Sequence, residues 1–536
     1  MTHSVFSARW LLAVSAAIGA LSCSSSDEGS DQVPGESPDA RPRLRNAKCQ
    51  PKPGPDLPDE RGFDSNCDGI DGDLRSAIFV APGGVETASG EPAAPVGTLS
   101  RAIALAQSSA RDVYVCSGIY SENVVVERAG VHVYGGFDCT KGWARTREPA
   151  VVAPSSGKPL RIVGTSDVLF QGVNFRAPDA ARPGESSVAV TVIDSKQVRI
   201  ENSVLEAGRG APGKAGEPAA PPVTSRPESA ANGGSAPRDL ECGLLTVSSP
   251  ACQGQLAGGL SAARPYTCAG AAGLYLGGWG GRGENAGPYA STTGTHGVTG
   301  SPASTNPRRL RTREGNPISG RQGRAGVSGG DGDAAKVGFG ALVNGEYLPS
   351  NTGTDGKPGG IGEAGDGGDG GRAVYDAQQA RWYLGGGGGQ GGFPGCGGGI
   401  GRGGGGGGAS VALVVVSSTL ALQNLSIVTA DGGVGGRPSA GSAGQPGGEP
   451  GQGGTGMQNA TVDTTGAVGG RGGDGGPGGN GGPGAGGPSL GIVVLGDEPD
   501  VLLTTYQIGK GGAGAAGLAG APAAAAGIAA NIRRVE

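Results

Sequence analysis

The sequence contains few aromatic residues, almost no histidine and no run of apolar residues long enough to span a membrane. Only 4 Trp, 8 Phe and 10 Tyr occur among 536 residues, which argues against large aromatic-lined pockets. The three histidines offer little imidazole for acid–base chemistry. The net charge of −5 provides no basic footprint for nucleic acid. No nucleophile with a base and an orienting group can be assembled, so no catalytic residue is predicted.

The N-terminal apolar segment has the length of a secretory signal. It begins at Trp10 and ends at Leu21, which fits the apolar region of a signal peptide. A membrane-spanning helix needs about 20 apolar residues. The segment is followed by Ser22-Cys23 and then by a polar, serine-rich stretch. We therefore predict that residues 1–22 are a signal peptide and that the protein is exported.

The residues around Cys23 resemble the lipobox of bacterial lipoproteins, with Ala20 at the position that usually holds leucine. The resemblance implies cleavage before Cys23, diacylation of its side chain, and a lipid-anchored protein at the outer membrane or cell surface. Residues 23–60 are rich in Ser, Asp, Pro and Gly, and they are predicted to form the anchor and a flexible stalk. An ordinary cleaved signal that releases a soluble protein is the alternative.

The cysteine count is compatible with export. Nine cysteines are present, and setting Cys23 aside leaves an even number, which suits an oxidising compartment. One pair, Cys116 with Cys139, flanks a predicted strand–turn–strand unit. Two further local disulfides are predicted, Cys49 with Cys67 and Cys242 with Cys252.

Residues 76–207 contain short, mostly alternating β-branched segments separated by turns, the pattern of half-buried strands. Between the first two segments, residues 98–106 place their apolar side chains on one helical face, and Thr98 is positioned to cap this helix. The helix is predicted to lie over the end of a stack of strands. The predicted strands are 78–80, 112–115, 123–126, 131–134, 160–163, 168–170, 188–192 and 198–200.

One strand pattern recurs along the chain. Ser187–Ile193 resembles Ser410–Val416 and, more loosely, residues 491–495, and each is followed after a short turn by another strand. Units of about 20–30 residues are typical of β-solenoids. Each unit runs into a glycine tract. We predict N-terminal coils at 76–207, a coil at 410–429, and a C-terminal coil with a Gly/Ala-rich tail at 488–536, separated by glycine-rich insertions at 208–409 and 430–487.

Two stretches carry a family resemblance. Ala77-Ile78-Phe79-Val80-Ala81-Pro82-Gly83 and Tyr134-Gly135-Gly136-Phe137-Asp138 resemble the start of pectate-lyase-like right-handed parallel β-helices. With Trp143-Ala144-Arg145 they also resemble glycine-rich surface lipoproteins of myxobacteria. The resemblance implies a mainly β fold, a right-handed parallel β-helix (solenoid) with a short N-terminal capping helix and large glycine-rich insertions. It does not imply lyase activity, because these motifs hold no catalytic residue.

Glycine recurs at every third position from Gly353 to Gly371 and from Gly386 to Gly407. This period matches a left-handed extended helix with three residues per turn. Two structures agree with it: a bundle of polyglycine-type helices hydrogen-bonded side to side, or loops without fixed structure. The entropy lost when glycine is ordered favours the second, so a bundle requires a dense network of backbone hydrogen bonds.

An acidic, cysteine-containing loop at residues 61–75 is the one candidate metal site. Oxygen-bearing side chains alternate along it, with Gly69 at the sixth position, as in the first half of a calcium loop. Arg75 stands where an EF-hand has its glutamate. The loop resembles an element of secreted myxobacterial proteins that implies metal binding, and a disulfide-pinned acidic turn is the alternative. The candidate Ca²⁺ ligands are Asp64, Asn66, Asp68, Asp71 and Asp73.

Together these features predict a non-catalytic cell-surface lipoprotein with a structural, adhesive or matrix-interaction role. Its expected partners are the membrane, through the lipid on Cys23, and polysaccharide or extracellular matrix, with no nucleic acid. The alternative is a polysaccharide-active β-helix enzyme, a lyase or a hydrolase. Such an enzyme requires acidic or basic side chains that converge on one face of the strand stack.

Overall fold

The computed structural model describes residues 49–59, 61–236, 242–243, 256, 258, 267–268, 275, 277–284, 316–349, 352–457 and 463–535. The chain divides into two compact units, Met1–Gln50 and Pro51–Glu536. The predicted signal peptide and Cys23 lie outside the described residues, whereas residues 51–59 of the predicted stalk belong to the second unit. Within the described ranges, no helix is both long and apolar enough to cross a membrane.

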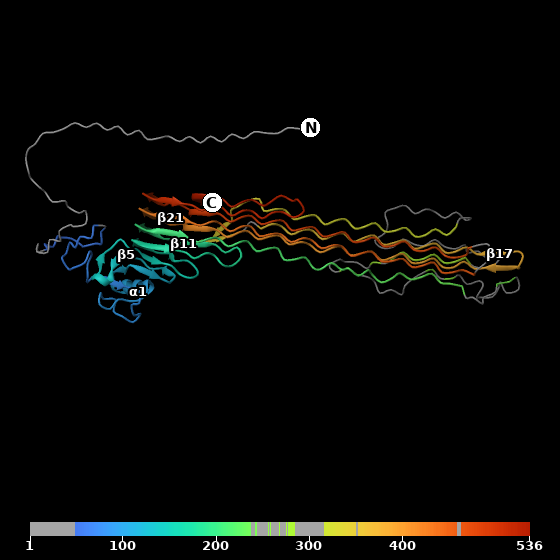
Figure 1. Cartoon of the computed structure of the whole chain (residues 1–536), viewed down its shortest axis with the longest axis horizontal. Helices are drawn as coiled ribbons and strands as arrows, with labels where there is room; N and C mark the ends of the chain where they lie inside the picture. The colour runs from blue at the N-terminus through green and yellow to red at the C-terminus, as the bar shows by residue number, and fades with distance from the viewer. Residues whose placement is uncertain are drawn as a thin grey trace, which may run out of the picture. The chain divides into compact units, whose positions relative to one another are not determined.

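Three sheets of parallel strands contain most of the strands of the second unit (Figure 1). The first comprises β1 (Ala77–Val80), β2 (Asp112–Cys116), β5 (Val131–Asp138), β9 (Ser166–Gln171), β12 (Lys196–Glu201), β20 (Leu420–Gln423) and β23 (Asp500–Leu502), with β6 (Ala144–Arg145) antiparallel to β5. The second comprises β3 (Gly118–Tyr120), β7 (Ala150–Val152), β10 (Val173–Arg176), β13 (Val204–Ala207), β21 (Ser426–Thr429) and β24 (Thr505–Gln507). The third comprises β4 (Val124–Val126), β8 (Leu160–Val163), β11 (Ser187–Ile193), β19 (Ser410–Val416), β22 (Ser489–Leu495) and β25 (Ala529–Val535).

The sheets receive strands in rotation along the chain: β8, β9 and β10 enter the third, first and second sheets, and β11, β12 and β13 repeat that order. The mainly β, parallel character predicted from the sequence is confirmed. The predicted repeats are neighbours in space, because Ser187 of β11 lies opposite Ser410 of β19, which in turn lies opposite Ser489 of β22. Aliphatic side chains from all three sheets form the main core, and each buried one contributes about 1.5–3 kcal/mol.

The helix predicted near residues 98–106 is present as α1 (Leu99–Ser109), which packs beside β1 and β2. The hydroxyl of Thr98 accepts a hydrogen bond from the backbone N–H of Arg101 at 3.2 Å, which confirms the predicted cap. The carboxylate of Glu122 also accepts the N–H groups of Leu99 and Ser100, at 2.7 and 3.0 Å. A carboxylate at this end of a helix stabilises it, because the first N–H groups have no partner within the helix.

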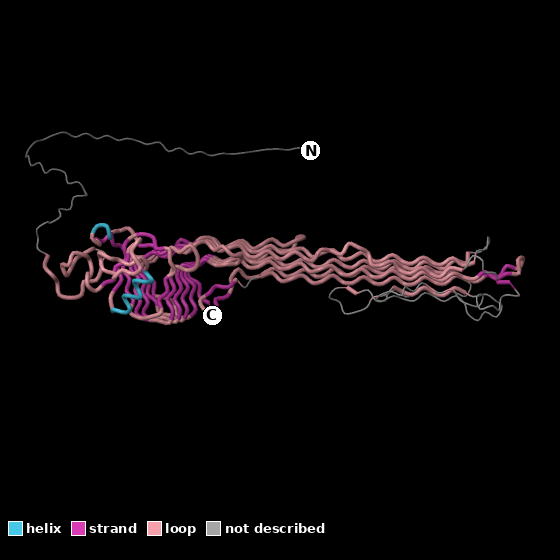
Figure 2. Tube along the Cα trace, turned by 90° about the horizontal axis from the view of Figure 1, so that it is seen from below, coloured by secondary structure: helices cyan, strands magenta, loops and turns pink. Residues whose placement is uncertain are grey.

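The glycine-rich segments lie side by side as an ordered bundle of extended strands of chain (Figure 2). Backbone hydrogen bonds recur at every third residue. Gly362 donates to the carbonyl of Gly395 at 3.0 Å, and Gly395 donates to Gly473 in a third segment at 2.9 Å. The sequence was compatible with a hydrogen-bonded bundle or with loops that lack a fixed structure. The described segments adopt the bundle.

Glycine is required inside this bundle for steric reasons. A Cβ atom built on Gly395 would lie 2.0 Å from the carbonyl oxygen of Gln445, and one on Gly473 would lie 1.9 Å from that of Arg324. Cβ atoms in proteins essentially never approach a heavy atom closer than 3.0 Å. The period of three therefore places glycine wherever the backbone of a neighbouring segment passes.

Short hairpins interrupt the long insertion. β15 (Ala341–Val343) pairs with β16 (Glu346–Leu348), and β17 (Val374–Asp376) pairs with β18 (Arg381–Tyr383), which also contacts β14 (Cys242–Gly243). In the first hairpin, Tyr347 is buried in a cluster with Val188 and Val411 on the third sheet. These hairpins were not predicted from the sequence.

The predicted disulfide between Cys116 and Cys139 is present. A second disulfide joins Cys268 to Cys396, 128 positions apart in the sequence, and was not predicted. Cys49 and Cys67 are each disulfide-bonded. The pairing predicted between Cys242 and Cys252 lies outside the described side chains.

Candidate functional site

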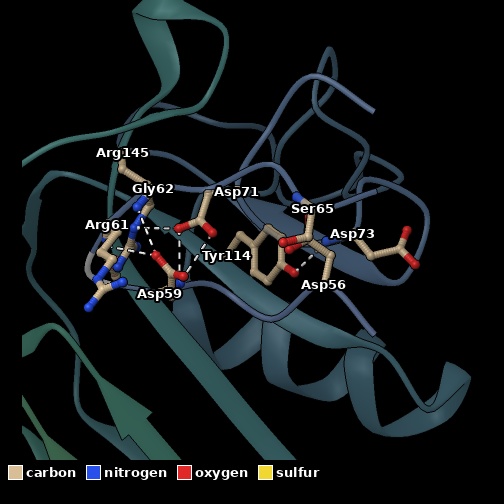
Figure 3. A network of polar contacts seen from close by, with 10 residues as sticks. Asp56, Asp59, Arg61, Gly62, Ser65, Asp71, Asp73, Tyr114 and Arg145 are labelled. Carbon is tan, nitrogen blue, oxygen red and sulfur yellow. Dashed lines mark hydrogen bonds and ion pairs between the residues drawn. The ribbon is translucent and has the colours of Figure 1, made fainter. Parts of the chain in front are cut away.

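A turn-rich polar segment, residues 56–59 and 61–76, covers one side of the first sheet near its start (Figure 3); we call it the collar. Its turns are held by carboxylates. Asp56 is buried and accepts the backbone N–H groups of Ser65 and Asn66, at 2.9 and 3.3 Å. Asp59 accepts those of Arg61 and Gly62, at 2.7 and 2.9 Å. Such bonds fix a segment that has no regular secondary structure.

The first three predicted calcium ligands share one loop of the collar. The amide of Asn66 donates to the carboxylate of Asp68 at 3.0 Å. Asp64 accepts the backbone N–H groups of Asp68 and Gly69, at 3.1 and 2.9 Å, and Asp68 accepts that of Leu74 at 2.7 Å. These carboxylate oxygens therefore already hold backbone donors.

The other two predicted ligands have different partners. Asp73 accepts hydrogen bonds from the backbone N–H of Arg75 at 2.9 Å and the hydroxyl of Ser76 at 2.8 Å, and these contacts lower its pKa. Asp71 is directed toward Arg145. Among the described residues, no group of three or more His, Cys, Asp or Glu side chains is arranged to hold a metal ion. Calcium binding stays a prediction.

The ion pair between Asp71 and Arg145 joins the collar to the first sheet. The carboxylate is 2 % exposed, and one of its oxygens lies 3.0 Å from the Nε of Arg145. The backbone N–H of Asp59 donates to both Asp71 oxygens, at 3.2 and 3.0 Å. Burial raises the pKa of Asp71 to about 6, and the nearby guanidinium opposes that rise. Arg145 also donates to the carbonyl of Gly135 and lies over the ring of Phe137.

An aromatic cluster lies beneath the collar. Tyr114 stacks on Phe137, with ring centroids 5.0 Å apart, and its hydroxyl accepts the backbone N–H of Asp73 at 2.9 Å. Gly72 passes so close that an added Cβ would lie 2.3 Å from the Tyr114 oxygen. Phe79, Tyr134 and Trp143 complete the cluster. In a chain with few aromatic residues, this concentration forms a separate small core that supports the collar.

His132 lies between two carboxylates. Its imidazole nitrogens are 3.4 Å from Asp112 and 3.2 Å from Asp167. The three residues come from β2, β5 and β9, which are successive strands of one sheet. Hydrogen bonding to Asp112, with a smaller contribution from Asp167, raises the pKa of His132. This cluster was not predicted from the sequence, because its members lie far apart along the chain.

We expect the His132 cluster to make stability depend on pH. The raised pKa means that the folded protein binds this proton more tightly than the unfolded chain. The stabilisation is therefore complete below pH ~6.5 and is lost as pH rises through the folded-state pKa. Urea unfolding at pH 5.5 and pH 8.5 should show that His132→Gln removes on the order of 0.5–1 kcal/mol of this dependence. An unchanged dependence in the variant would contradict the assignment.

The chain matches no protein-family model, and neither the curated proteins nor the solved structures contain a match.

Proposed function

We propose that the protein is a non-catalytic, lipid-anchored surface protein in which a right-handed parallel β-helix carries a stiff glycine-rich bundle that contacts extracellular polysaccharide or matrix. The hydrogen-bond network of the glycine segments is the observation that carries this proposal. Because each inner segment bonds to several neighbours, the bundle resists bending in a way that a flexible linker does not.

The rotation of strands among three parallel sheets supports the β-helix. A β-helix contributes one strand to each sheet per coil, as β8–β10 and β11–β13 do. The first large insertion lies between β13 and β19, and the second lies between β21 and β22. In both cases the insertion connects a strand of the second sheet to the next strand of the third sheet. Insertions at one corner of successive coils are how solenoids display binding segments.

The anchor is proposed from the sequence around Cys23. We expect a fatty-acid analogue to label the wild-type protein in a bacterial host that processes lipoproteins, and we expect the protein to sediment with membranes. Cys23→Ala should abolish labelling and release the protein. Persistent membrane association of the unlabelled variant would count against the anchor.

The adhesive role is tested with the purified full chain in detergent. Binding to a panel of immobilised polysaccharides and matrix preparations, without chemical change of the polysaccharide, is the expected result. Release of new reducing ends or of unsaturated sugars would overturn the non-catalytic proposal and favour the alternative, a polysaccharide-active lyase or hydrolase. Absence of binding to every surface would overturn the adhesive role.

Calcium at the collar is a further proposal that rests on the alternating carboxylates of residues 64–73. A ligand that binds only the folded state stabilises it by about 2.7 kcal/mol at one hundred times its Kd. Calcium should therefore raise the Tm, and chelation should lower it. Asp64→Asn should weaken both effects, while the exposed-pair variant Arg182→Ala should leave them intact. An unchanged Tm after chelation would contradict calcium binding.

A further inference from the structure

Beside the collar lies a groove of about 530 Å³. Several segments of the chain form its walls. The collar contributes Arg61, and β6 with the residues after it contributes Arg145 and Arg147. The C-terminal ends of β9, β12 and β20 contribute Gln171, Asn202 and Asn424. The ion pair between Asp71 and Arg145 thus fixes one wall of the groove (Figure 3).

The lining of the groove carries an excess of positive charge. Its charged residues are three arginines and one acid, Glu148, which gives a formal charge of +2. Asp71 behind Arg145 and Asp59 beside Arg61 offset this charge, so the guanidinium groups of Arg61 and Arg147 are the cationic groups that an incoming ligand meets. The side chains of Arg61 and Arg147 are exposed. A guanidinium binds carboxylate, sulfate or phosphate groups through two parallel hydrogen bonds, so this wall suits an oxyanion.

The opposite wall is a row of amides. The Nδ2 of Asn424 donates to the Oδ1 of Asn202 at 2.7 Å, and Gln171 lines the groove on the neighbouring strand. Asn202 and Asn424 follow paired positions of adjacent strands, which lie about 4.8 Å apart, whereas Gln171 is paired with Glu201 and lies one position earlier.

We propose that this groove binds an anionic glycan, with the arginines on its acidic groups and the amide row on its hydroxyls. The inference goes beyond the proposed function, because it adds a glycan site beside the collar that is separate from the glycine-rich bundle. Carboxylate-bearing uronates and sulfated sugars share this chemistry. A neutral glycan would leave the arginines without a counter-charge, and a small inorganic anion would leave the amide row unused.

Fluorescence anisotropy on the full chain in detergent tests the proposal. The probes are labelled oligogalacturonate, a sulfated heparin octasaccharide and a neutral dextran oligosaccharide of the same length. We expect at least one acidic probe to bind tenfold more tightly than dextran, and which of the two does so identifies the acidic group. Equal affinity for acidic and neutral probes overturns the proposal.

Three variants locate the binding. The double variant Arg61→Ala/Arg147→Ala should weaken acidic-probe binding at least tenfold and flatten its salt dependence, since both side chains are exposed and the Tm should not change. Gln171→Leu should weaken glycan binding severalfold but leave the salt dependence in place. Arg182→Ala, which removes an exposed arginine from a different surface, is the matched control. If the double variant binds the acidic probes as tightly as the wild type does, the groove assignment fails, while the adhesive function proposed for the bundle stands.

Discussion

Gly395→Ala is expected to destabilise the glycine bundle by about 3 kcal/mol or more. The added methyl group would lie 2.0 Å from the carbonyl oxygen of Gln445 and 2.7 Å from the backbone nitrogen of Gly475. Neither contact can be relieved by a side-chain rotation, because both atoms belong to the backbone. The segments of Gln445 and Gly475 must move away by about 1 Å, which breaks the hydrogen bonds from Gln445 to the carbonyl of Cys396 and from Gly395 to that of Gly473.

Gly330→Ala is the matched control. It lies in the same bundle, yet its added Cβ would meet only the flexible side chain of Lys357, at 3.8 Å. This variant should be neutral or more stable by about 0.4–1 kcal/mol, because alanine restricts the unfolded chain. Hydrogen exchange of the amides in residues 386–408 and urea unfolding measure both variants. Equal effects of the two substitutions would contradict the packing argument.

Asp71→Ala is expected to cost about 3 kcal/mol, because it removes the carboxylate partner of Arg145 and leaves the backbone N–H of Asp59 without its acceptor. The collar is the part that should loosen. Limited proteolysis should cut residues 56–76 faster in the variant, and urea unfolding should give the loss in free energy. Arg182→Ala disrupts an exposed ion pair and should change neither.

Asp71→Asn distinguishes the contribution of the hydrogen bond from Asp59 from that of the negative charge facing Arg145. Asparagine keeps an oxygen for the Asp59 N–H, so its loss should be smaller than that of alanine. The folded-state pKa of Asp71 is raised to about 6, so the folded protein binds this proton more tightly than the unfolded chain. The resulting stabilisation is complete below the unfolded-state pKa of 3.8 and is lost as pH rises through 6. The asparagine variant should lack that decline, and an unaltered pH profile would contradict the role of burial.

The strand-rich parts of the fold could be predicted because their signals are local. Alternating β-branched residues and the Thr98 cap each specify a structure within a few positions, and the similarity of Ser187–Ile193 to Ser410–Val416 revealed that they stack. The strands of the second sheet, such as β3, β7, β10 and β13, were missed, because each has only three or four residues with at most two buried positions. The equally short β4 was predicted because it consists of three consecutive valines.

The bundle and the collar were harder to predict for a different reason. Glycine at every third position is compatible with a disordered loop and with a hydrogen-bonded extended helix. The helix forms only where neighbouring segments supply the hydrogen-bond partners, and these cannot be identified from local sequence. Likewise, Asp71 belongs to an acidic motif in sequence, but its partner Arg145 lies 74 positions later (145 − 71). The disulfide between Cys268 and Cys396 depends on the packing of distant segments, which no local spacing indicates.

The three-residue register of the bundle restricts how such a chain can change in length during evolution. Inserting one or two residues into a single segment would move a side chain into the position that a passing backbone requires to be glycine. Inserting a whole triplet into two antiparallel neighbours, at the far ends where they turn, would preserve every existing contact. Each triplet adds about 9 Å at 3.1 Å per residue. The reach of the bundle can therefore vary in discrete steps among descendants of one gene, while the sheets at its base stay unchanged.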